Sequence, residues 1–259
     1  MPTILMPPPT TRCPTTTDSL FAGRLVCRQP QSGYRFSVDA VLAAHFVLPK
    51  PGQRVLDLGC GCGVIGLMLA HRVKQVTVNG LELQPELAQL ARENVRANGL
   101  EERMHIVQGD VCAPSQTLPP EVYDLVVCNP PYGTGEDGRI NQQAQAALAR
   151  HGLAGKLEDF VRAAAFAVRN RGRVVFIVPA RRAADLLTLL RAQRLTPKRM
   201  QPIYSAPEAD AAKLVLIEGL KNGGEQFEVL APFFIYQQLQ GDYSAAMQVL
   251  YSEGECSPP

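Results

Sequence analysis

Short apolar runs alternate with longer segments of helical periodicity through the middle of the chain. The apolar runs have the length and the branched side chains of buried strands. A proline opens one of the helical segments and an Asn-Gly pair closes it, both common boundary signals. The expected strands are Arg54–Leu58, Val76–Leu83, Met104–Val107, Val122–Cys128, Arg173–Val178 and Lys213–Glu218. The expected helices are Asp39–Leu48, Val64–Arg72, Pro85–Asn98, Leu157–Val168 and Arg181–Arg194.

This alternation of strands and helices predicts an α/β fold with a doubly wound, mostly parallel sheet. Ligands of such folds bind at the carboxyl ends of the strands, near the point where the strand order reverses. The residues that directly follow each expected strand are therefore the first candidates for chemistry.

The regions outside the core have a different composition. Residues 1–19 are rich in proline and threonine and are expected to be a disordered tail. Leu20–Phe36 is expected to form a hairpin that turns at Gln31–Gly33. We divide the chain into that tail, a hairpin and helix extension (20–50), the core (51–220) and a C-terminal strand and tail (221–259).

Composition narrows the class of protein. Hydrophobic residues make up 46% and charged residues 19% of the chain, as in a globular domain. No basic-then-apolar leader and no apolar run long enough for a membrane are present in the sequence, so a reducing cytoplasm is expected. The seven cysteines are odd in number, and Cys60 and Cys62 read as small residues of a tight turn, so no metal is expected.

The net charge of +2 hides an uneven distribution. Arg139 to Arg199 contains 13 Lys or Arg and 3 Asp or Glu, whereas Met200 to Pro259 contains 2 and 8. A basic block in an enzyme indicates a polyanionic substrate. The alternative is that these side chains scatter over several elements and never form one surface.

A glycine-rich loop follows the first core strand. Gly59, Gly61 and Gly63 allow a sharp turn and a close approach of the backbone to a ligand. Gly66 also completes G-x-G-x-x-G, so the spacing leaves a nicotinamide-binding fold open. Asp57 argues against it, because a carboxylate repels a pyrophosphate but suits the ammonium of a methionine moiety.

Two more acidic residues stand at the ends of the next strands. Glu82 closes the second core strand, where it could accept both hydroxyls of a ribose. Asp110 follows the third strand, where it could accept an adenine amino group while Val111 packs on the ring. A solvated strand end for Glu82 and a turn or helix cap for Asp110 are the alternatives.

The sharpest signal is Asn129-Pro130-Pro131-Tyr132, directly after the fourth strand. Two prolines stop the strand and fix the backbone. The Asn129 side chain and the Pro130 carbonyl can then accept from one planar amino group, which frees its lone pair for attack on a sulfonium methyl. Tyr132 offers a ring on which a flipped base can stack.

With these residues the chain resembles the class I methyltransferases, whose fold is a Rossmann-like, seven-stranded sheet and whose donor is S-adenosylmethionine, converted to S-adenosylhomocysteine. Longer stretches resemble the tRNA1(Val) (adenine-37-N6)-methyltransferase family, from about Leu20 to about Tyr251. They are Gly33 to Leu42, Leu81 to Gln84, Asn129 to Tyr132 with Gly138-Arg139, Ala149 to His151, and Asp242 to Ser244.

The resemblance implies methylation of adenine N6 in tRNA, at adenosine 37. It also implies that Phe36, Asp39, Cys60 and Leu83 join the donor contacts. It places Arg139, Arg150 and His151 near the target base or its phosphates. Gly152 departs from the pattern, since the relatives often carry an acidic residue there. No membrane partner is expected, and a monomer and a homodimer both stay open.

Other acceptors carry the same quartet. Glutamine methyltransferases of release factors and guanine-N2 methyltransferases of rRNA are the alternatives, because any planar amino group fits the chemistry. The glutamine enzymes usually have a helical N-terminal domain, whereas about 50 residues precede the glycine loop here. A methyltransferase fold kept as a binding subunit is a further alternative, although every expected chemical position is filled.

Overall fold

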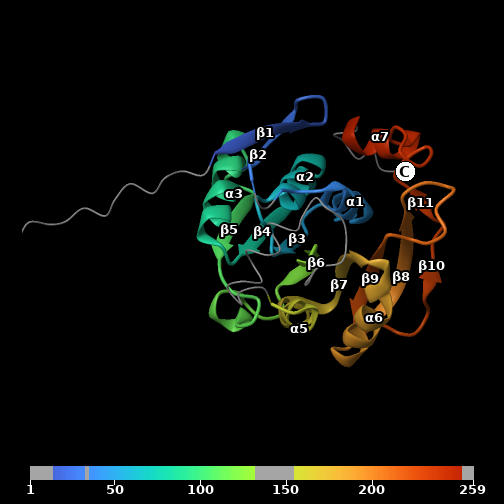
Figure 1. The fold of residues 1–259 in the computed structure, drawn as a ribbon. Helices are drawn as coiled ribbons and strands as arrows, with labels where there is room; N and C mark the ends of the chain where they lie inside the picture. Colours follow the sequence, from blue (N-terminus) through green and yellow to red (C-terminus); the bar gives the residue numbers. More distant parts are fainter. Residues whose placement is uncertain (1–13, 33–34, 132–154, 253–259) are drawn as a thin grey trace, which may run out of the picture.

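The computed structural model describes residues 14–32, 35–131 and 155–252, and its centre is a single mixed sheet (Figure 1). The strand order is β10-β8-β9-β7-β6-β3-β4-β5, and β11 also pairs with β8. Strand β9 is antiparallel to both of its neighbours, and the other pairs are parallel. The bounds are β3 (Arg54–Leu58), β4 (Thr77–Glu82), β5 (Met104–Gln108), β6 (Tyr123–Cys128), β7 (Val168–Pro179), β8 (Leu195–Tyr204), β9 (Leu214–Lys221), β10 (Glu228–Val229) and β11 (Phe233–Phe234).

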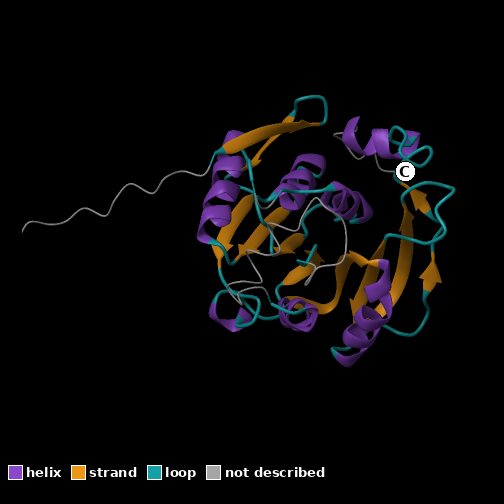
Figure 2. Cartoon of the chain, in the orientation of Figure 1, coloured by secondary structure: helices purple, strands orange, loops and turns teal. Residues whose placement is uncertain are grey.

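Helices cover both faces of this sheet (Figure 2). Helices α1, α2 and α3 contribute to one hydrophobic core, and α5 and α6 contribute to the other. The bounds are α1 (Val38–Phe46), α2 (Val64–Arg72), α3 (Pro85–Ala97), α5 (Leu157–Ala167), α6 (Ala183–Ala192) and α7 (Ala245–Ser252), with short 3-10 turns at Pro114–Gln116 and Ala180–Arg182. The prediction of a doubly wound α/β fold is confirmed.

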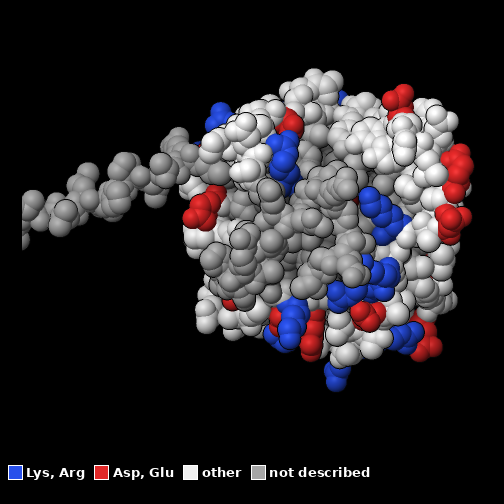
Figure 3. Space-filling model, in the orientation of Figure 1, with Lys and Arg blue, Asp and Glu red and all other residues white. Residues whose placement is uncertain are grey.

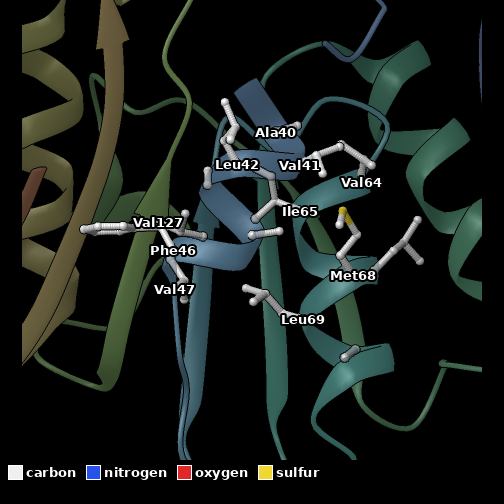
Figure 4. Packing of buried hydrophobic residues seen from close by; sticks show 14 of the residues in the cluster. Ala40, Val41, Leu42, Phe46, Val47, Val64, Ile65, Met68, Leu69 and Val127 are labelled. Carbon is white, nitrogen blue, oxygen red and sulfur yellow. The ribbon is translucent and has the colours of Figure 1, made fainter. Parts of the chain in front are cut away.

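The strands supply the two cores by simple alternation. In β6, Leu125 and Val127 join the core of α1 and α2, while Val126 and Cys128 join the core of α5 and α6. Figure 4 shows Val127 beside side chains of α1 and α2. Because every second residue points to the same face, strands buried on both faces read as continuous apolar runs.

The N-terminal hairpin lies earlier in the chain than the sequence predicts. Strands β1 (Thr15–Leu20) and β2 (Leu25–Pro30) pair antiparallel. The prediction of disorder is therefore wrong for residues 15–19, and the turn predicted at Gln31–Gly33 lies at residues 21–24 instead. The reason is tertiary: Phe21 is fully buried, stacks on His71 of α2 at 5.2 Å, and donates its N–H to the Tyr251 carbonyl of α7.

The C-terminal part of the sheet also contains more strands than the sequence pattern predicts. Strand β8 was not expected, because Pro197 and Pro202 cannot donate to a ladder. Its pairing with β9 shifts between Pro197 and Arg199, and within the part of the chain that the structure describes its other side pairs only with the two-residue strands β10 and β11. Strands β3 to β9 make up the seven-stranded sheet that the resemblance implies, with β8 as the strand that the sequence pattern did not predict, and β10 and β11 extend that sheet. The expected C-terminal strand and tail contains these two strands and helix α7.

Candidate functional site

The register of the parallel strands brings the candidate residues to one edge of the sheet. Leu58 at the end of β3 aligns with Leu81 of β4 on one side and with Cys128 of β6 on the other. Glu82 aligns with Gln108 at the end of β5. Asp57, Glu82, Asp110 and Asn129 therefore all lie at the carboxyl edge, on either side of the point where the strand order reverses between β3 and β6.

The glycine loop adopts a backbone that favours glycine. Gly59, Gly61 and Gly63 have φ values of +70°, +57° and +86°, a region that side chains with a Cβ rarely occupy. The N–H groups of Gly59 and Cys60 both donate to the Leu81 carbonyl, at 2.8 and 3.0 Å. The loop is thus attached to the end of β4 before helix α2 begins.

Asp57 is the most buried carboxylate of this edge. Its side chain is 1% exposed, and Oδ2 accepts from the Gly66 N–H at 3.2 Å. Oδ1 is buried without a hydrogen-bond partner among the described residues. Burial, together with a smaller contribution of the nearby Glu82 carboxylate, raises the pKa of Asp57 to about 7, although the Gly66 hydrogen bond lowers it. An unsatisfied buried carboxylate oxygen is a fitting partner for a ligand's ammonium group.

Glu82 is held in place by backbone groups. Its Oε2 accepts from the Gly61 N–H and its Oε1 from the Gln84 N–H, both at 2.9 Å. Burial raises the pKa of Glu82, while these hydrogen bonds act in the opposite direction. Each oxygen keeps a second lone pair, so the side chain has the capacity to accept two ligand hydroxyls.

Asp110 and Val111 follow β5 in an ordinary turn. Asp110 Oδ1 accepts from the Cys112 N–H at 2.8 Å, which is the turn role that the sequence left open. Asp110 is only partly exposed, and Val111 is 7% exposed within the core of α5 and α6. Both lie at the same edge as Glu82, so the turn role and a ligand role are compatible.

Asn129 leaves the sheet directly beside the glycine loop. The aligned neighbours Leu58 and Cys128 are joined by a hydrogen bond from the Cys128 thiol to the Leu58 carbonyl, at 3.4 Å. Asn129 and Gly59 are the next residues of the two strands. Pro130 is buried and Pro131 is partly exposed. Tyr132, Arg139, Arg150 and His151 lie outside the described residues.

The remaining residues predicted to contact the methyl donor lie in different surroundings. The Phe36 N–H donates to Gln29 Oε1 at 3.0 Å, which ties the entry of α1 to the hairpin. Asp39 lies in the first turn of α1, and Leu83 is half-buried beyond β4. Cys60 is 3% exposed, and a Cβ on Gly80 would lie 2.7 Å from its sulfur. Its side chain therefore packs against β4, while its N–H donates to the Leu81 carbonyl and its carbonyl accepts from the Gly63 N–H.

The basic residues of the central block are divided between the two edges of the sheet. Arg169 and Arg173 lie at the start of β7, at the edge opposite Asn129, and form ion pairs with Asp124 and Glu218. Arg181 and Arg182 follow the end of β7, on the same edge as Asn129. Figure 3 accordingly shows Lys and Arg in several separate groups. The described arginines of the block lie at both ends of β7, which agrees with the alternative of scattered side chains.

One residue at this site was not predicted from the sequence. Asn94 of α3 is fully buried, and its Nδ2 donates to the Cys62 carbonyl in the glycine loop at 2.9 Å. Asparagine is uncommon on the buried face of a helix, and this departure from the helical pattern is the signal that could have found it.

Neither a membrane-spanning helix nor a cluster of metal ligands occurs among the described residues. These residues contain no helix that is both long and apolar enough to cross a membrane. They also contain no group of three or more His, Cys, Asp or Glu side chains arranged to hold a metal ion.

Known proteins resemble this chain over most of its length. A protein from Porphyromonas gingivalis named tRNA1(Val) (adenine(37)-N6)-methyltransferase is 29% identical over 205 residues, which cover 77% of this chain and 80% of the relative. A protein of the same name from Aliivibrio salmonicida is 25% identical over 184 residues, which cover 71% and 76%.

The fold has solved counterparts as well. The crystal structure of a predicted O-methyltransferase from Agrobacterium tumefaciens matches 83% of this chain and 96% of its own, with a TM-score of 0.68 and 23% identity. At that identity the match supports the fold alone. The family described as "Methyltransferase small domain" matches residues 38–178, from the start of α1 to the end of β7. The chain therefore belongs to the methyltransferase small domain family.

Proposed function

We propose that this protein transfers a methyl group from S-adenosylmethionine to N6 of an adenine in tRNA, at adenosine 37 beside the anticodon. One observation carries the proposal. Asn129 and Pro130 leave β6 next to Gly59. The hydrogen-bond acceptors for the target amino group and the pocket for the methyl donor therefore share one edge of the sheet.

The donor pocket is built from the glycine loop and the acidic strand ends. Asp57 Oδ1 takes the ammonium of the methionine moiety, which supplies the partner that this buried oxygen lacks among the described residues. Glu82 accepts the ribose hydroxyls, and Asp110 with Val111 holds the adenine. Phe36, Asp39 and Leu83 border the same pocket, together with the backbone of Cys60, Gly61 and Gly63. When bound, S-adenosylmethionine supplies an electrophilic methyl group.

The acceptor half positions a weak nucleophile. The amino nitrogen of adenine shares its lone pair with the ring. Hydrogen bonds to the Asn129 side-chain oxygen and the Pro130 carbonyl draw this nitrogen toward tetrahedral geometry and free the lone pair. Tyr132 stacks on the flipped base, and Arg139, Arg150 and His151 contact the target or its phosphates.

The choice of substrate is supported by the two relatives of 25% and 29% identity named as tRNA adenine-37 N6-methyltransferases. The basic block supports it less than its net charge suggests, because its arginines are divided between two edges. A tRNA substrate places the protein in the cytoplasm.

The test is a set of three incubations of the purified protein with labelled S-adenosylmethionine. The first contains unmodified tRNA, the second rRNA and the third a release-factor protein. Digested products are then identified by mass spectrometry. We expect N6-methyladenosine in tRNA, lost when adenosine 37 is replaced. N5-methylglutamine or N2-methylguanosine in its place would assign the chain to one of the other acceptors.

A further inference from the structure

The N-terminal hairpin is attached to helix α3 by two asparagine side chains. Asn98 Oδ1 accepts from the Val26 N–H at 2.9 Å, and its Nδ2 donates to the Val26 carbonyl at 2.7 Å. Asn94 Oδ1 likewise accepts from the Arg28 N–H, and its Nδ2 donates to the Arg28 carbonyl, both at 2.8 Å. The two carboxamides therefore pair with β2 as the peptide groups of a third strand would.

The spacing explains why asparagines four apart on a helix suit this edge. Four residues of helix rise about 6.0 Å. Two residues of antiparallel strand rise about 6.8 Å. Val26 and Arg28 are alternate residues of β2 and turn the same backbone groups outward, so one helix face matches two successive positions of the strand.

Asn94 makes two hydrogen bonds that have no counterpart at Asn98. Its Nδ2 donates to the Cys62 carbonyl at 2.9 Å, and to the Cys27 sulfur of β2 at 3.6 Å. Asn98 Nδ2 instead donates to the Asn94 carbonyl within the same helix, at 2.7 Å. Asn94 thus joins the hairpin, helix α3 and the glycine loop, whereas Asn98 joins only the hairpin and the helix.

The contact completes the hydrogen bonding of one peptide in the loop. The N–H between Cys62 and Gly63 donates to the Cys60 carbonyl at 2.8 Å, and the carbonyl of the same peptide accepts from Asn94. The hydrogen bonds to Leu81 and Glu82 hold the loop from the side of β4. Asn94 of α3 holds it as well, through a side chain that is fully buried.

We propose that Asn94 is a positioning residue for the methyl donor: it fixes the Cys62–Gly63 peptide and makes the donor loop depend on the docked hairpin. The inference rests on the proposed function only in taking the glycine loop as the donor site. Fixing the loop before the ligand binds lowers the ordering cost of binding, so its loss weakens donor binding rather than the reaction step.

The test compares Asn94→Leu with the matched control Asn98→Leu in the full chain. Both variants remove a carboxamide pair from β2, and only the first also frees the Cys62 carbonyl. We measure the Kd for S-adenosylhomocysteine by calorimetry without RNA, then kcat, the donor KM and the Tm. The expected result is a Kd and a donor KM about tenfold higher for Asn94→Leu than for Asn98→Leu. The kcat values of the two variants should agree within about threefold, and both variants should lose a comparable amount of Tm.

Equal donor affinities in the two variants, or an effect that follows the loss of Tm, would overturn the inference. If Asn94→Leu does not fold, Asn94→Asp and Asn98→Asp repeat the comparison, because an ionised aspartate keeps the shape and the acceptor but cannot donate. If the wild-type protein methylates tRNA and the two variants have the same donor affinity, the inference fails while the proposed function stands. A wild-type protein that does not bind S-adenosylhomocysteine contradicts the proposed function itself.

Discussion

The two edges of the sheet bury carboxylates in opposite ways. At the amino edge, Glu218 of β9 is 8% exposed and lies 3.4 Å from Arg173 and 3.0 Å from Arg199. At the carboxyl edge, Asp57 is more buried, yet its Oδ2 accepts from a backbone N–H and not from a cation. A buried carboxylate is stabilised by paired cations and costs free energy without them. The first edge is therefore built for stability and the second keeps a charge available for a ligand.

The arginines of the amino edge also hold a helix. Arg199 lies over the Phe46 ring at 4.4 Å, and Arg173 donates to the Leu48 carbonyl at 2.8 Å. Both groups belong to the end of α1 or the residues just after it. The same charges that satisfy Glu218 thus fasten α1 to the sheet, so changes at this edge should affect folding before they affect chemistry.

The largest effect is expected from Asn129→Ala at the carboxyl edge. The substitution removes an acceptor that acts mainly in the transition state, so kcat should fall by about a thousandfold. The Kd for S-adenosylhomocysteine and the Tm should stay near the wild-type values. Turnover close to that of the wild type would refute the proposed role of Asn129.

Asp57→Asn should weaken the binding of the donor by about a hundredfold, because a neutral amide replaces the partner of the ammonium group. The same variant should be more stable without ligand. At pH 8 the carboxylate is ionised although its folded pKa of about 7 lies above its ordinary 3.8, so the charge destabilises the fold. Urea unfolding at pH 8 should show a gain on the order of 2 kcal/mol, and a loss of stability would contradict the contrast between the edges.

Glu218→Gln makes the same carboxylate-to-amide change at the amino edge, and its effect on stability should have the opposite sign. Two partly buried arginines lose their counter-charge, at a cost of about 2 kcal/mol. Urea unfolding measures the loss, and donor affinity in the folded protein should not change. If both variants moved stability in the same direction, burial alone and not pairing would govern the two sites.

The smallest expected effect is a dependence of donor affinity on pH. Asp57 must ionise to attract an ammonium group, so S-adenosylhomocysteine should bind about tenfold more tightly at pH 7.5 than at pH 6, since the folded pKa is about 7. Calorimetry across this range measures it. Asp57→Asn serves as the control, because its profile should be flat, and a flat profile in the wild type would disprove the assignment.

The sequence by itself determined the core of the sheet and the order of the polar strand ends. Strand β3 and helix α2 have the predicted bounds, because a strand buried on both faces and a helix opened by glycines are encoded locally. The same holds for the positions of Asp57, Glu82, Asp110 and Asn129, since each lies within two residues of the end of its strand.

Tertiary structure decided what local pattern does not encode. The hairpin turn falls at Phe21 because a ring packs on His71 of a distant helix, and β8 forms despite two prolines because β9 supplies its ladder. The distribution of the arginines over two edges depends on which end of β7 each one occupies. The link from Asn94 to Cys62 depends on a helix, a hairpin and a loop that meet only in the folded chain, where a carboxamide can satisfy groups more than thirty residues apart.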